Sequence, residues 1–481
     1  MPNGKQPPFI SQDSVRRALD TLLYSSSDKK TSLLSLLLVD EFLAQPDLPH
    51  SSLSREFALG QILTSAIIAE FARHRSVFEH AFPQSNISRE SVFELIRLDA
   101  ESASPDLIGW SWLYHHFVRI ELNLHAPEFC KLVAIEERTL RRYQQYTIKR
   151  LTNILIEQER SAHIRQRRRR LLSELPGVAT MATELLREEV SNYVNRMLHE
   201  ASPPHFCITG SRGVGKTTFV ESIVHKQIEI SQIDQLIWIQ MPVSVEYIHH
   251  YLIERLIPLE SQISLRDYLV IHRTVIVLDD ADMLFNSLPR VRSLLQMLSQ
   301  AAVFMTCSSY MSIPDTIEVT LQEFSEADMR IYANHILAAT RYSSPPMDGV
   351  KQHLHDIWER VGGNPLATQM VIRNLPYFDL KSINDALGID AIYNRIFQVL
   401  DEKARIAWLI LILMPPGAIE FDTLYTSWPE AITRDGIGNL LQHHIVEVVS
   451  EPLRYQLVNA ARHYVEEVYR QDSYVSKMVD R

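Results

Sequence analysis

Apolar residues recur at three- and four-residue intervals across residues 13–125, a pattern that predicts a series of amphipathic helices. Stretches rich in proline and serine, at 45–52 and 101–106, separate these helices. One predicted helix, over residues 110–122, carries five large apolar side chains: Trp110, Trp112, Tyr114, Phe117 and Ile120. We interpret them as a buried aromatic cluster, with a ligand pocket as the alternative. Residues 1–125 are therefore expected to form an N-terminal helical domain.

Two helices joined by a tight break are predicted after this domain. The first covers residues 128–133 and the second begins near Arg138, with the small residues Cys130 and Ala134 where the helices must touch. The pattern resembles the helix-turn-helix of sigma-factor-like and other bacterial regulators. A hairpin of this kind either contacts DNA or serves structure and protein binding, and the pattern fits both. The candidate DNA contacts, which could reach phosphates and base edges, are Arg138, Arg141, Arg142 and Lys149.

The second of these helices is expected to continue through a run of arginines to Glu174. Residues 138–170 hold eleven Lys and Arg against two Glu, a local net charge of +9 in a chain of net charge −10, so the remainder carries −19. The negative total argues against a general nucleic-acid coat protein. The basic segment itself needs a polyanion, a row of carboxylates or water beside it.

From residue 206 the pattern changes to short apolar runs that alternate with amphipathic helices. The runs at 206–208, 235–239, 274–278 and 302–306 predict buried strands. Strands that alternate with helices are typical of a parallel sheet covered by helices on both faces. An α/β domain is therefore predicted over residues 183–321.

Length and composition limit the class of protein. The 481 residues are enough for several domains, and 46% apolar with 22% charged residues is typical of soluble globular chains. Only 14 residues are glycine, which favours a helix-rich fold, and three cysteines are too few for a disulfide framework or a zinc cluster. Because the sequence shows neither a signal peptide nor an apolar run of about 18 residues, we expect a cytoplasmic protein without a membrane partner.

The most specific feature is a glycine-rich loop between the strand at 206–208 and the next helix. Its spacing, G-x-x-x-x-G-K-[ST], is that of a phosphate-binding loop, whose glycines let successive backbone N–H groups face phosphate oxygens. Lys216 would add a charge to the β- and γ-phosphates, and the Thr217 hydroxyl would ligate Mg²⁺. The predicted cofactors are therefore ATP or ADP with Mg²⁺, bound by Gly210, Ser211, Arg212, Gly213, Val214, Gly215, Lys216, Thr217 and Thr218.

Two carboxylates follow the apolar run at 274–278, and we expect this strand to lie beside the first one. Asp279 would hold Mg²⁺ through water. The predicted catalytic residues are Asp280, as the general base that polarises the attacking water, and Lys216, through its charge on the phosphates. The alternative is a pair of acidic residues that only ends a strand in a turn.

The order of these motifs resembles the NB-ARC family of STAND ATPases. It comprises the phosphate loop, the strand that ends in Asp279 and Asp280, the strand at 303–306, a segment at 321–328, and Gly362-Gly-Asn-Pro365. The resemblance covers about residues 190–470 and implies a small helical bundle over 322–385 and a winged helix over 386–481. It also implies that Pro365 contacts the adenine.

The sequence departs from the family at two nucleotide contacts. The family usually ends the strand at 303–306 with an arginine that senses the γ-phosphate, where this chain has Thr306-Cys307-Ser308. The winged helix usually carries a Met-His-Asp motif whose histidine touches the β-phosphate, and the aligned stretch here is Leu457-Val458-Asn459. We also find no repeat of 20–50 residues that could form a sensor domain.

A multidomain protein follows, made of an α-helical N-terminal region, an α/β P-loop NTPase with a parallel sheet, a helical bundle and a winged helix. The predicted domains are 1–125, 126–182 (the helix-turn-helix-like segment and basic linker helix), 183–321, 322–385 and 386–481. The predicted function is an ATP- or ADP-binding STAND switch and slow ATPase that regulates transcription or a stress or defence response through nucleotide-dependent domain rearrangement. DNA, through the basic hairpin, and a second copy of the chain, in the ATP state, are its candidate partners. The alternatives are an AAA+-like loader or transposition ATPase on DNA, and a nucleotide-stabilised scaffold without turnover.

Overall fold

The computed structural model divides into two compact units, Met1–Arg167 and Arg168–Arg481. The residues that the structure describes are 10–23, 32–44, 52–83, 88–177, 186–200, 202–257, 263–308, 313–339, 354–374, 388–414, 419–429, 431–450, 454–458 and 460–465. None of the helices within these ranges is long and apolar enough to cross a bilayer.

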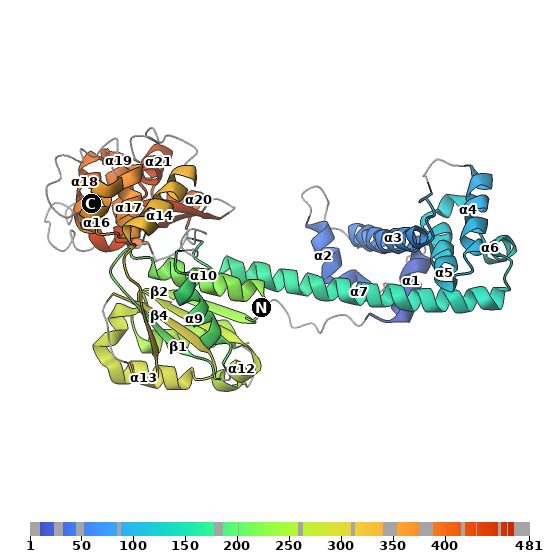
Figure 1. Cartoon of the computed structure of the whole chain (residues 1–481), viewed down its shortest axis with the longest axis horizontal. Coiled ribbons are helices and arrows are strands. Elements are labelled where there is room, and N and C mark those ends of the chain that lie inside the picture. Colours follow the sequence, from blue (N-terminus) through green and yellow to red (C-terminus); the bar gives the residue numbers. More distant parts are fainter. Residues whose placement is uncertain are drawn as a thin grey trace. The chain divides into compact units, whose positions relative to one another are not determined.

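The first unit is helical throughout its described residues (Figure 1). Its core contains the fully buried side chains of Phe71, Trp110 and Phe129. The elements are α1 (Gln12–Leu23), η1 (Ser32–Ser35), α2 (Leu37–Leu43), α3 (Ser52–Val77), α4 (Arg89–Glu101), α5 (Pro105–Leu113), η2 (Tyr114–Val118), η3 (Ile120–Leu122), α6 (Ala126–Val133) and α7 (Glu137–Ser173), which continues into the second unit.

The single helix expected over residues 110–122 is wrong. Helix α5 ends at Leu113, η2 is a π-helical turn and η3 is a 3₁₀ turn. In the π turn the N–H of Arg119 bonds to the carbonyl of Tyr114, 3.0 Å away, so one extra residue rotates the side chains that follow. Ile120 consequently points to solvent, with 45% of its surface exposed. The other four aromatic residues are buried, which confirms the interpretation as an aromatic core.

The predicted pair of helices around the break at residue 134 is present as α6 and α7. Ala134 ends α6 in the left-handed conformation, with φ of 54°, a position that usually favours glycine. The N–H of Ile135 bonds to the carbonyl of Cys130 at 3.1 Å, which closes the turn. Phe129 and Leu140 are buried and join the two helices to the core of the unit.

The second unit contains a five-stranded parallel sheet in the order β2-β3-β4-β1-β5. The strands are β1 (His205–Thr209), β2 (Gln235–Gln240), β3 (Thr274–Asp279), β4 (Ala302–Cys307) and β5 (Ile317–Thr320). The expectation that the strand ending in Asp279 lies beside the first strand is wrong, because β4 pairs with both β1 and β3 and separates them. The consequence is chemical: the last residues of β4, including Thr306, lie between the phosphate loop and the acidic pair.

Helices cover both faces of this sheet (Figure 1). Side chains of one face, such as Phe206 and Ile208, pack against α9 (Glu188–Leu198), α10 (Lys216–Glu229) and the end of α7. Side chains of the other face, such as Cys207 and Ile276, pack against α11 (Val245–Leu256), α12 (Leu265–Ile271) and α13 (Leu288–Met297). The 3₁₀ helix η4 (Ala281–Ser287) follows β3 directly. The α/β architecture predicted for this region is therefore confirmed.

The C-terminal part of the second unit is mainly helical and has one hydrophobic core, in which Tyr393 and Trp408 are fully buried. A small antiparallel sheet of order β6-β8-β7 belongs to it. The elements are α14 (Glu326–Ala339), α16 (Leu354–Val361), α17 (Pro365–Arg373), α18 (Ile389–Val399), α19 (Glu402–Leu413), β6 (Ile419–Glu420), α20 (Phe421–Ser427), α21 (Arg434–Gln442), β7 (Val446–Ser450) and β8 (Arg454–Leu457). Residues 460–465 form a further helical turn after β8.

Candidate nucleotide site

The glycine-rich loop connects β1 to α10 at the carboxyl end of the sheet, as the sequence predicts. Gly215 precedes the first turn of α10 with φ of 94°, and the N–H of Phe219 bonds to its carbonyl at 2.9 Å. Gly213, at the tip of the loop, has φ of 79°, and a Cβ there would lie 2.8 Å from Asn364 Oδ1. Both positions need glycine, one for its backbone angle and the other also for space. Val214 is fully buried and anchors the loop below the tip.

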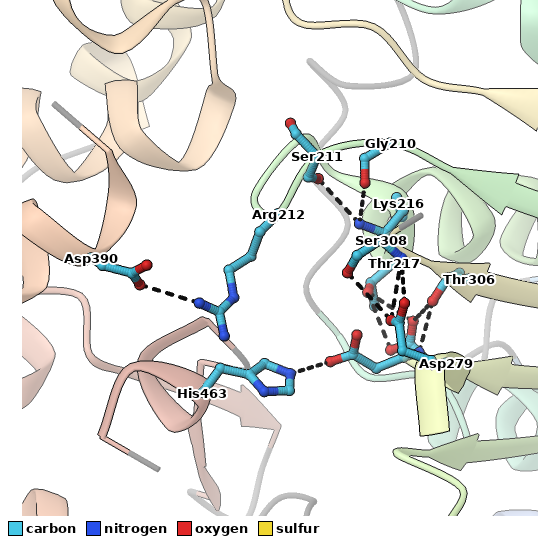
Figure 2. Close-up of polar contacts among 12 residues, drawn as sticks. Gly210, Ser211, Arg212, Lys216, Thr217, Asp279, Thr306, Ser308, Asp390 and His463 are labelled. Atoms are coloured by element: carbon cyan, nitrogen blue, oxygen red, sulfur yellow. Dashed lines mark hydrogen bonds and ion pairs between the residues drawn. The ribbon is translucent and has the colours of Figure 1, made fainter. Parts of the chain in front are cut away.

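Lys216 is the first residue of α10, and its side chain folds back over the loop (Figure 2). Its ammonium donates to the carbonyl of Gly210 at 2.8 Å and to that of Ser211 at 3.1 Å. Burial lowers the pKa of Lys216, and the carboxylates of Asp280 and Asp282 oppose this shift. The ammonium is thus held at the place where phosphate oxygens are expected.

Asp279 ends β3 and is fully buried. Thr217 Oγ1 donates to it at 2.9 Å and Thr306 Oγ1 at 2.7 Å, so hydroxyls from α10 and β4 both orient the carboxylate. Burial raises the pKa of Asp279, while these hydroxyl bonds lower it. The cluster offers only oxygen ligands, which is the donor set that Mg²⁺ requires.

Asp280 is in the left-handed conformation, with φ of 60°, where β-carbon sterics make a non-glycine residue uncommon. Its N–H donates to Thr306 Oγ1 at 2.8 Å. Burial, together with the charges of Asp279 and Asp282, raises the pKa of Asp280 to about 6. Its Oδ2 lies 2.6 Å from Nε2 of His463, a residue in the turn after β8 (Figure 2).

The C-terminal helices reach the phosphate loop directly. Asn364, whose side chain caps α17, donates to the carbonyl of Arg212 at 2.8 Å, and the N–H of Leu366 donates to the carbonyl of Gly213 at 3.2 Å. The Arg212 guanidinium pairs with Asp390, the second residue of α18, at 3.1 Å (Figure 2). The tip of the loop is therefore held by hydrogen bonds from the N-terminus of α17 and by an ion pair with the N-terminus of α18.

A cavity of about 600 Å³ lies over the loop. Its wall brings together Lys216, Thr217 and Thr218 of the NTPase part with Pro365 and His463 of the C-terminal part. Pro365 is buried at the first position of α17, where a missing N–H costs nothing. The structure thus places Pro365 at the same cavity as the phosphate loop, although the two are far apart in sequence.

Sequence reasoning missed Arg187, which is buried beside the loop. Its guanidinium donates to the carbonyl of Val214 at 2.6 Å and lies 5.3 Å from the ring centroid of Phe324. Burial lowers the pKa of Arg187 to about 10. Sequence reasoning also missed Thr306 as a ligand-orienting residue and His463. For the contact of Asn364 with the loop, one local signal was available: an asparagine directly before a proline is typical of the start of a helix.

The candidate DNA-contact residues lie elsewhere, on α7 in the first unit. Arg138, Arg141, Arg142 and Lys149 are all exposed. Arg141 lies 3.7 Å from Glu137, one turn earlier in the same helix. Two of the later arginines have carboxylate partners in their own units: Arg165 contacts Glu41 at 2.6 Å and Arg168 contacts Glu229 at 2.8 Å.

The sequence of the α/β part decides the family. Residues 187–309 match the family model of the NB-ARC domain, a range that contains the phosphate loop and the acidic pair. The chain contains an NB-ARC domain over these residues. The NB-ARC match begins at Arg187 and ends just after β4, and no curated protein sequence matches the chain significantly.

Several solved structures are similar to this NB-ARC chain at low identity. A STAND protein with a tetratricopeptide repeat sensor from Pyrococcus horikoshii is 13% identical, with a TM-score of 0.38 over 59% of this chain, and the match spans 42% of that protein. The ORC1 protein of Aeropyrum pernix, solved in complex with DNA, is 16% identical, with a TM-score of 0.34, 65% coverage of this chain and 98% of that one. Cdc6p from Pyrobaculum aerophilum is 12% identical, with a TM-score of 0.30, 61% coverage of this chain and 94% of that one.

Proposed function

We propose that the chain is a cytoplasmic molecular switch that binds ATP and ADP with Mg²⁺ and hydrolyses ATP slowly. The observation that carries this proposal is the preformed phosphate loop with Lys216 and the oriented Asp279, inside a cavity that the C-terminal helices complete. Such a site couples bound nucleotide to the position of the C-terminal part, because the nucleotide and the C-terminal helices contact the same loop. The switch would regulate transcription or a stress or defence response.

The residues of the site fall into clear roles under this proposal. Backbone N–H groups of the loop and the N-terminus of α10 bind the phosphates, and Lys216 moves its ammonium from loop carbonyls to phosphate oxygens. Thr217 and Asp279 hold Mg²⁺, which supplies charge neutralisation at the phosphates. Asp280 accepts a proton from the attacking water, and Pro365 packs against the base.

The C-terminal part supplies the moving element in this proposal. The three-stranded sheet β6-β8-β7 packed with α19 and α21 supports a winged helix, and α14, α16 and α17 support a helical bundle. Exchange of nucleotide would change the contacts of Asn364, Leu366 and Asp390 with the loop. Surfaces freed by that change would allow self-association in the ATP state.

The direct test is nucleotide binding by the whole chain. We expect ADP in the protein as purified, and calorimetric affinity for ATP that falls about ten- to a hundredfold in Lys216→Ala, because a charge-assisted contact is lost. Mass measured with and without ATP tests self-association. Unchanged affinity in the variant would remove the assignment of the phosphate loop.

DNA binding is a second candidate function, which the exposed basic face of α7 favours. Duplex DNA binding followed by fluorescence anisotropy at about 50 and 200 mM salt should show a log–log slope near −5 if about six phosphates are contacted. The triple change of Arg138, Arg141 and Arg142 to Ala should lower that slope by about three. If the parent does not bind at the lower salt, with or without ATP, the basic face serves another role. Steady ATPase activity stimulated by DNA would instead favour an AAA+-like loader. Bound nucleotide without turnover would favour a nucleotide-stabilised scaffold.

A further inference from the structure

The contact between His463 and Asp280 joins the last described helical turn to the acidic pair of the NTPase. Nε2 of His463 lies 2.6 Å from Asp280 Oδ2, and the two residues are 183 positions apart in sequence. Both side chains are largely buried, with 28% of His463 and 19% of Asp280 exposed. In Figure 2 a dashed line from the imidazole of His463 marks this contact.

The turn that carries His463 is firmly attached to the C-terminal core. The neighbouring Arg462 is buried and donates to the carbonyls of Ile412 at 2.7 Å and Met414 at 3.1 Å, at the end of α19. Tyr464 and Val465 are buried in the same core. The backbone that carries the imidazole is therefore held by the C-terminal part.

The contact has a direct consequence for the carboxylate. A general base must offer an oxygen lone pair to the attacking water. Nε2 of His463 lies 2.6 Å from Asp280 Oδ2, so the imidazole stands at that oxygen, where the attacking water would have to lie.

We propose that His463 is a positioning residue that engages the Asp280 carboxylate and thereby suppresses hydrolysis while the C-terminal part is docked on the nucleotide site. This inference rests on the proposed function and names its regulation. The contact is made to the acidic pair, and departure of the C-terminal part would release the Asp280 carboxylate.

The test measures kcat and KM for ATP in the full-length chain and four variants. His463→Ala removes the donor, and we expect kcat to rise about tenfold or more, with KM within severalfold of the parent, since a hydrogen bond to a charged group is commonly worth about ten- to a hundredfold. His463→Gln places an N–H donor near the former Nε2 and should keep the low rate. His463→Asn, one methylene shorter, cannot reach Oδ2 and should behave like Ala. In His463→Ala combined with Asp280→Asn the rise should vanish.

Two further measurements separate the possible failures. His335→Ala, which removes an exposed imidazole from α14 outside the cavity, should leave kcat unchanged. Calorimetric ATP binding by the parent tests the proposed function independently, and its absence would remove both ideas together. With binding intact, a lower kcat in His463→Ala would make His463 part of the catalytic base, and equal or undetectable turnover in parent and variant would show that this contact does not limit hydrolysis. Either result overturns the inference.

Discussion

Two glycines of the second unit provide a matched test of how tightly the phosphate loop is packed against the C-terminal helices. Gly213 and Gly362 both have positive φ, of 79° and 62°, so alanine at either position carries the left-handed backbone penalty of about 1–2 kcal/mol. Only their surroundings differ. A Cβ at Gly213 would lie 2.6 Å from Ile389 Cδ1, 2.8 Å from Asn364 Oδ1 and 2.9 Å from Leu366 Cβ, whereas nothing lies within 4 Å at Gly362.

The overlap at Gly213 cannot be relieved at all three neighbours. The end of Ile389 can rotate, but Asn364 is held by its bonds to Arg212 and Ala367, and the Cβ of Leu366 moves only with α17. Overpacking of this kind costs about 1–3 kcal/mol, so Gly213→Ala should destabilise the second unit by about 2–5 kcal/mol and Gly362→Ala by about 1–2 kcal/mol.

Urea unfolding of both variants, followed by a signal from the second unit, measures this difference. The parent and each variant should have equal m-values, so that a change in midpoint reports stability alone. Gly213→Ala should also weaken ADP binding, because relief of the overlap displaces the loop that binds phosphate, while Gly362→Ala should not. Equal destabilisation by the two substitutions would refute the close packing of the loop tip against α17 and α18.

Three other predictions concern single contacts. Asp280→Asn should abolish turnover while ATP affinity, measured by calorimetry, stays within severalfold, because shape is kept and the base is lost; equal turnover would show that Asp280 only ends a strand. A double-mutant cycle on Arg212 and Asp390 should give a coupling below about 1 kcal/mol in unfolding experiments, because the side chains are 29% and 56% exposed, and a larger value would mean that the pair is shielded from water. Burial lowers the pKa of His115 to about 3. Below the ordinary pKa of about 6.5 the imidazole therefore takes up a proton in the unfolded state but not in the folded state. The first unit should consequently lose about 2 kcal/mol of stability between pH 7 and 5. His115→Phe should flatten that dependence, and an unaltered pH profile would contradict the buried, neutral imidazole.

Sequence patterns were sufficient wherever the structure is determined by neighbouring residues. The phosphate loop was predictable because its glycine spacing, the apolar strand before it and the helix after it lie within one continuous segment, and β1 and α10 follow as expected. The break at Ala134 was predictable from helix periodicity for the same reason. The π turn at 114–118 was not predictable, because it places Tyr114 against Phe71 of α3, and helix periodicity carries no information about that distant partner.

Sheet order was the first property that local patterns could not determine. Any order of four buried apolar strands satisfies the same alternation of strand and helix, so the position of β4 between β1 and β3 depends on tertiary packing. That order has a chemical result, because it brings Thr306 within 2.7 Å of Asp279. Thr306-Cys307-Ser308 looked like the loss of an arginine, and the structure shows that Thr306 instead orients the carboxylate expected to hold the metal.

The same limit applies to the contacts that complete the site. Asn364, Asp390 and His463 reach the phosphate loop or the acidic pair from more than 100 residues away in sequence, and each is a polar residue whose local pattern fits an ordinary helix end or surface. Their meaning comes from where the C-terminal core places them. On the cavity wall, the ammonium of Lys216 bonds to loop carbonyls and the guanidinium of Arg212 pairs with Asp390. An oxygen of Asp280 contacts His463. Under the proposed function, nucleotide phosphates would compete with these contacts, and the competition at Arg212 would link occupancy of the site to the position of the C-terminal part, because its partner Asp390 lies there.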